Sequence, residues 1–121
     1  MINKKNKNTL KNDIIKLEKK IKSSFPIKSV VVYKIDNNTT NLVIGEALDN
    51  ISLERYLSFK NTTILVSPDN KYKSKLIFQI STSETVTLLF VINSYYIECF
   101  DFGNEKMILD IVKKTKIESG D

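Results

Sequence analysis

The sequence predicts an α+β fold, with a central antiparallel sheet of about five to six strands and helices at the N-terminal and C-terminal ends. Two observations carry this prediction. Short runs of β-branched residues separated by turn residues fill the middle of the chain, and amphipathic patterns of helical period lie near both ends. The length of 121 residues fits one domain with its own core. We expect this domain to span residues 9–117, between a disordered basic tail at 1–8 and a frayed end at 118–121.

Residues 9–24 have the pattern of an amphipathic helix that ends before Pro26. Its apolar positions are spaced four, three and four residues apart, and they are Leu10, Ile14, Leu17 and Ile21. This spacing forms a narrow seam of the kind that packs one helix against another. We therefore predict that the seam forms a dimer contact, together with a second helix at 105–116.

The residues after this helix predict a hairpin and a short helix. Strands are expected at 29–36 and 41–47, and Gly45 marks a bulge or a close backbone approach in the second strand. A short helix is expected at 52–59, after the capping residues Asp49 and Asn50.

Four further strands precede the last helix. The run from Leu88 to Ile92 is apolar without interruption, which predicts a central strand covered on both faces. Asn104 is expected to cap the last helix. The four predicted strands comprise residues 62–67, 75–81, 85–93 and 95–101.

The basic charge is concentrated at the N-terminal end. Residues 1–28 carry a net charge of +7, whereas the remaining 93 residues carry −2. Lysine outnumbers arginine 18 to 1, and the abundance of Lys, Asn and Ile is typical of a genome with low GC content. Arginine is the residue best suited to bidentate recognition of phosphates and bases. A nucleic-acid partner is therefore disfavoured, and a lysine arm that binds nucleic acid stays as an alternative.

The composition excludes several classes of chemistry. The chain has no histidine and a single cysteine, Cys99, which excludes a His-based triad, a His metal site and a disulfide framework. We expect Cys99 to be a small buried side chain, because no histidine is present to generate a thiolate. We predict no catalytic residue, no metal site and no cofactor. No apolar run exceeds five residues, so we expect no membrane segment and a cytoplasmic location.

Several aromatic residues are candidates for lining a small-ligand pocket beneath the short helix. They are Tyr33, Tyr56, Phe59 and Phe78. The alternative is ordinary core packing, since aromatic residues of sheets more often pack in the core or across strands.

Three local patterns have counterparts in a known family. Residues 29–36 with 41–47, residues 74–80 with 86–92, and residues 100–109 resemble the opening hairpin, the central strand pair and the entry into the last helix of a GAF domain. GAF domains belong to the profilin-like group, which also includes PAS and roadblock domains. The resemblance covers about residues 9–117.

The sequence also departs from this family. The glycine that commonly follows the central hairpin turn is absent, since residues 83–86 are Ser-Glu-Thr-Val. The Asn-Lys, Phe and Asp-Glu pattern of cyclic-nucleotide-binding members is incomplete, and no histidine is available to surround a tetrapyrrole. A cyclic nucleotide or a bilin is therefore disfavoured as a ligand.

The resemblance implies a non-catalytic regulatory or protein-interaction module that forms a homodimer, binds a protein partner and senses a small ligand. Two alternatives stay open. One is a nucleic-acid-associated protein that uses the lysine-rich arm, and the other is a small inhibitor or immunity-type protein that binds one partner through a sheet edge or an acidic surface. GAF, PAS and roadblock domains differ in strand order, which local patterns do not supply.

Overall fold

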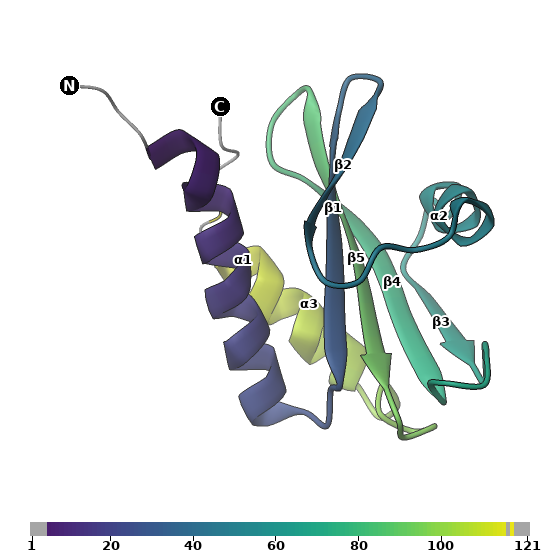
Figure 1. The fold of residues 1–121 in the computed structure, drawn as a ribbon. Coiled ribbons are helices and arrows are strands. Elements are labelled where there is room, and N and C mark those ends of the chain that lie inside the picture. Colours follow the sequence, from purple (N-terminus) through teal and green to yellow (C-terminus); the bar gives the residue numbers. More distant parts are fainter. Residues whose placement is uncertain (1–4, 116, 118–121) are drawn as a thin grey trace.

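The computed structural model describes residues 5–115 and 117, and it has the α+β fold that the sequence predicts (Figure 1). A five-stranded sheet carries helices on both faces. In chain order the elements are α1 (Lys5–Ser24), β1 (Ser29–Asp36), β2 (Thr39–Ile44), α2 (Asn50–Leu57), β3 (Thr63–Val66), β4 (Ser74–Ser81), β5 (Val86–Ser94) and α3 (Asn104–Lys114).

The strands pair in the order β2-β1-β5-β4-β3, and every neighbouring pair is antiparallel. The apolar run from Leu88 to Ile92 lies in β5, and all five of its side chains are 0% exposed. The prediction of a central strand covered on both faces is therefore confirmed.

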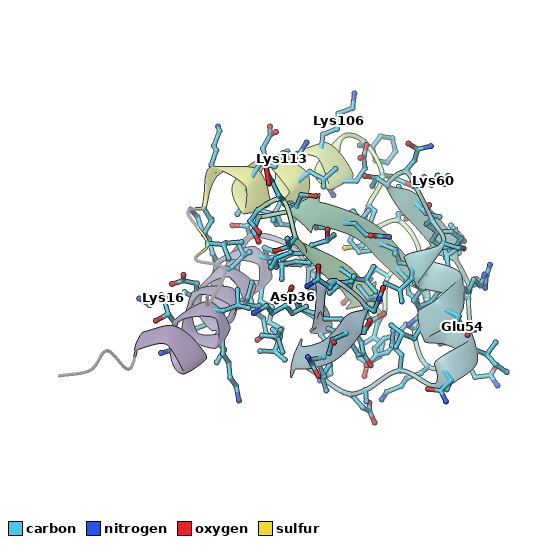
Figure 2. All side chains as sticks on the ribbon, turned by 90° about the horizontal axis from the view of Figure 1, so that it is seen from above. Lys16, Asp36, Glu54, Lys60, Lys106 and Lys113 are labelled. Atoms are coloured by element: carbon cyan, nitrogen blue, oxygen red, sulfur yellow. The ribbon has the colours of Figure 1, made fainter. Side chains whose placement is uncertain are left out.

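The two faces of the sheet bury two separate apolar cores. Helices α1 and α3 cover one face, and α2 lies against the other (Figure 1). Even-numbered residues of β1 and β5, such as Val32 and Phe90, point towards α1 and α3. Odd-numbered residues, such as Val31 and Leu89, point towards α2, as the period of two in a strand requires. Exposed charged side chains lie on the outer faces of the helices, as Lys16, Glu54 and Lys106 show (Figure 2).

Helix α2 begins with the cap that the sequence predicts at Asp49. The Asp49 carboxylate accepts hydrogen bonds from the backbone N–H of Ser52 at 2.8 Å and from its hydroxyl at 3.0 Å. These two hydrogen bonds hold the pKa of Asp49 below its usual value. The cap therefore fixes where the short helix starts over the sheet.

Residues 95–103 differ from the prediction, because they form successive turns instead of a strand at 95–101. The backbone N–H of Cys99 bonds to the carbonyl of Tyr96, and that of Asp101 bonds to the carbonyl of Glu98. Cys99 and the adjacent Phe100 are both buried in the same core. Consecutive residues of a strand point to opposite faces, so this pair excludes a strand here.

The ends of two helices also differ from the sequence expectations. Helix α1 begins at Lys5, so residues 5–8 are helical and not part of a disordered tail; residues 1–4 and 118–121 lie outside the described residues. Gly103, and not Asn104, is the N-cap of α3. The Asn104 side chain instead donates to the carbonyl of Cys99 at 2.8 Å.

Gly45 follows β2 where the backbone passes close to β1. The Gly45 φ angle is +93°, and a Cβ at this position would lie 2.6 Å from the carbonyl oxygen of Val30. The register between β1 and β2 also shifts between Val32 and Tyr33. The close approach that the sequence predicts at Gly45 is therefore confirmed.

Replacing Gly45 with alanine is expected to lower the free energy of unfolding by about 2–5 kcal/mol, since backbone strain and a steric clash add together. Gly103→Ala is the matched control, because Gly103 has a φ of +86° but no atom within 4 Å of the added Cβ. We expect it to lose only about 1 kcal/mol, from strain alone. Urea unfolding of both variants measures the difference, and equal losses would contradict this account.

Candidate functional site

The seam of α1 packs inside the chain. Its four apolar side chains lie in the core between α1, α3 and the sheet, with exposed fractions of 6% for Leu10, 0% for Ile14, 2% for Leu17 and 0% for Ile21. A second copy cannot contact these side chains unless α1 leaves the sheet. Intramolecular packing therefore replaces the dimer contact that the sequence predicts for this seam.

The four predicted pocket residues separate into two groups. Tyr33, Tyr56 and Phe59 meet between α2 and the sheet, whereas Phe78 lies on the opposite face and stacks on Phe90 with ring centroids 4.9 Å apart. The strand alternation of β4 causes this separation, because Phe78 points towards α1 and α3.

The three aromatic side chains under α2 fill their space as a packed core. Tyr33 and Tyr56 are each 5% exposed, and the rings of Tyr56 and Phe59 lie 5.9 Å apart. The Tyr33 hydroxyl accepts a hydrogen bond from the backbone N–H of Leu48 at 2.8 Å, and burial raises the pKa of Tyr56. These side chains therefore anchor α2 and the segment that precedes it.

A buried lysine lies on the α2 side of the sheet, near the end where β1 begins. Lys75 is 5% exposed, and its Nζ donates to Oδ1 of Asn93 at 2.7 Å. The same Nζ lies 3.4 Å from Oδ2 of Asp69 and 4.9 Å from the centre of the Tyr72 ring. The ammonium group thus has a carboxylate, an amide and a ring as partners, as a buried charge requires.

Asp69 joins this lysine to the loop between β3 and β4. Its Oδ1 accepts from the backbone N–H groups of Lys71 and Tyr72, each at 2.8 Å. Burial alone would raise the pKa of Asp69, but these two hydrogen bonds and the charge of Lys75 together hold it below its usual value. The cluster fixes the loop over the sheet and closes off the amine, so its role is structural.

Cys99 is buried as the sequence predicts. The side chain is 3% exposed, and burial raises the pKa of its thiol. A reactive cysteine needs the opposite shift. Among the described residues, no three His, Cys, Asp or Glu side chains are grouped so that they could hold a metal ion. In the same part of the chain, no helix is long and apolar enough to cross a membrane.

The two edge strands of the sheet differ in how they are protected. Strand β2 packs against α1, and its pairing with β1 contains a register shift. Strand β3 is paired on one side only, with β4, and its Ile64 and Val66 are 38% and 57% exposed. An open edge with exposed apolar side chains is a site where another strand can pair. We take the outer edge of β3 as the candidate functional site.

Sequence reasoning located the β3 strand at 62–67 but did not identify it as an edge. Strand order is set by which strands meet in space, and the local pattern of Ile64 and Val66 does not contain it. The buried Lys75 was also missed, although one signal pointed to it. A lysine at the start of a run as apolar as residues 76–80 must pair its charge if that strand lies inside the sheet.

No protein-family model, curated protein or solved structure matches this chain. The GAF-like resemblance therefore stays a prediction.

The Asp69 cluster predicts a dependence of stability on pH. The folded-state pKa of Asp69 is lowered, so its contribution is present above the unfolded-state pKa of about 4 and is lost as the pH falls through the folded-state value. We expect Asp69→Asn to lose less than about 1 kcal/mol at pH 7, since the Asp69 side chain is 42% exposed. The variant should also lose less stability than wild type on acidification.

Urea unfolding at pH 7 and at pH 3 measures this difference. Asp110→Asn, on the exposed side of α3, is the matched control and should keep the wild-type dependence on pH. An Asp69→Asn variant that loses stability with acid as steeply as wild type would show that the carboxylate does not act in this way.

Proposed function

We propose that this chain is a non-catalytic, GAF-like protein-interaction module that forms a homodimer through antiparallel pairing of β3 with β3 of a second copy. The observation that carries the proposal is the open edge of β3, with its exposed Ile64 and Val66. The seam of α1 cannot serve, because its side chains are buried in the chain's own core.

Pairing of two β3 strands provides hydrogen-bond partners for the backbone N–H and C=O groups that water otherwise solvates. An antiparallel pair of identical strands is symmetric, so with Leu65 opposite Leu65 each Ile64 lies opposite Val66 of the second copy. Leu65 packs towards the α2 core, and the alternation along the strand places Ile64 and Val66 on the opposite face of the sheet. The sheet of five strands would become a continuous sheet of ten.

The contact is small, and this sets the expected affinity. Strand β3 has four residues, so a few backbone hydrogen bonds and four apolar side chains meet at the interface. Each hydrogen bond contributes about 1 kcal/mol net. We therefore expect a weak dissociation constant of roughly 100 µM, which corresponds to about −5 kcal/mol.

The proposal includes neither catalysis nor a bound small molecule. The one thiol is buried with a raised pKa, and the one buried amine among the described side chains, that of Lys75, is already paired with Asn93 and Asp69. The aromatic residues under α2 are packed against one another. The regulatory output of the module would then be its association with protein partners.

Sedimentation equilibrium tests the homodimer. Between about 5 µM and about 1 mM, which bracket a dissociation constant of roughly 100 µM, the wild-type mass should rise from one chain towards two. Val66→Glu and Ile64→Glu should stay at one chain, because each places a charged side chain opposite an apolar side chain at two places in the contact. Circular dichroism checks that the variants fold.

Leu42→Glu is the matched control, because Leu42 is 40% exposed on the other edge strand, β2. This variant should associate as wild type does. A wild-type chain that stays monomeric at 1 mM would overturn the proposal, as would a Leu42→Glu variant that dissociates as fully as Val66→Glu.

A further inference from the structure

Exposed apolar side chains gather on the segment between β5 and α3 and on the first turn of α3. Tyr96 is 63% exposed, Ile97 47%, Phe102 93% and Met107 55%. Burying exposed apolar side chains is favourable, so several of them in one short segment make it a candidate interaction site. We call this set the 96–107 surface.

The backbone that carries the 96–107 surface is held in place. Cys99 and Phe100, in its middle, are 3% and 2% exposed in the core beneath α3. The carbonyl of Tyr96 accepts from the hydroxyl of Ser74 at 2.7 Å, and the side chain of Asn104 donates to the carbonyl of Cys99 at 2.8 Å. A partner would therefore meet a surface that is already ordered, and binding would cost little conformational entropy.

Phe102 is exposed although it stands at a position from which a side chain can pack on the first turn of α3. It directly precedes Gly103, the N-cap of α3, and Met107 is the fourth residue of the helix counted from Asn104. Side chains at these two positions often pack on each other. Here Phe102 is 93% exposed, so Met107 does not cover it.

The backbone conformation at Phe102 is also energetically unfavourable. Its φ angle is +54°, in the left-handed region that disfavours residues with a Cβ. A glycine or a polar residue at this position would relieve the strain or the exposure. A strained and exposed phenylalanine is better explained as an anchor for a partner than as a part of the core.

The charge of this segment favours a basic partner. Residues 95–107 contain three acids and one base, Lys106, which is a net charge of −2 in a chain with a net charge of +5. Two of these acids, Glu98 and Asp101, are exposed and flank the apolar side chains. Lys106, the one base of this segment, points away from the sheet (Figure 2). The 96–107 surface is thus apolar with an acidic border.

We propose that the 96–107 surface binds a basic, amphipathic segment of a partner protein. Phe102 and Ile97 would meet the apolar face of that segment, and Glu98 and Asp101 would pair with its lysines or arginines. The complementary charges would fix the orientation of the segment and speed its association. This proposal goes beyond the β3 homodimer and does not depend on it.

A model peptide tests this proposal. The probe is a fluorescein-labelled helical peptide built from Lys and Leu with an amphipathic pattern, and its partner probe has Glu at every Lys position. Fluorescence anisotropy is measured with the full chain and with Val66→Glu, so that loss of the homodimer does not alter the outcome. We expect the Lys peptide to bind both proteins, with an affinity that falls as salt rises, and the Glu peptide to bind at least tenfold more weakly.

Two variants locate the binding site. Phe102→Gly should weaken binding of the Lys peptide at least tenfold, while its urea midpoint does not fall, because glycine tolerates the left-handed backbone. The double variant Glu98→Lys, Asp101→Lys should weaken binding similarly. The matched controls are Ile51→Gly, which removes an apolar side chain that is 81% exposed on α2, and Glu84→Lys in the turn between β4 and β5. Both controls should bind as wild type does.

Three results would overturn the proposal. The first is no binding of the Lys peptide to the wild-type chain. The second is binding that Phe102→Gly leaves unchanged, and the third is an equal loss with Ile51→Gly or Glu84→Lys.

Discussion

The fold depends on a central strand whose side chains must be shielded from water on both faces of the sheet. Every side chain from Leu88 to Ile92 in β5 is 0% exposed, so apolar layers have to cover the two faces of the sheet. A sheet with two apolar faces is stable only when other elements cover both of them, and here helices do so. Helices α1 and α3 supply one layer, and the shorter α2, fixed by its Asp49 cap, supplies the other (Figure 1). The parts of the sheet that stay exposed are those that these three helices do not cover.

This constraint decides where partners can bind. The seam of α1 has the spacing of a dimer contact. Its side chains are buried against the sheet of the same chain, so a second copy cannot contact them. Strand β3 lies at the edge of the sheet, where Ile64 and Val66 stay exposed. The turns at 95–103 are anchored by Cys99 and Phe100 and leave Phe102 in solvent. Among the side chains that the structure describes, the lysine-rich outer face of α1 adds charge but no exposed large apolar residue.

The sequence alone predicted the fold class, the central strand, the close approach at Gly45 and the burial of Cys99, because each has a local cause. The hydrophobic periodicity, the turn and capping residues and the composition can all be recognised within a short stretch of sequence. The partners of the α1 seam and the edge position of β3 were not predictable, since both depend on strand order. The prediction of a strand at 95–101 was wrong. The alternation of residue types in this segment also fits successive turns with two adjacent buried side chains.

Hydrogen exchange of the full chain, measured at several protein concentrations, distinguishes pairing through β3 from pairing through α1. Amides of β3 should gain protection as the concentration rises, because they pair with a second copy. Amides of α1 should be equally protected at every concentration, because their helix belongs to the core of each chain. The opposite pattern, in which α1 gains protection with concentration and β3 does not change, would contradict the account.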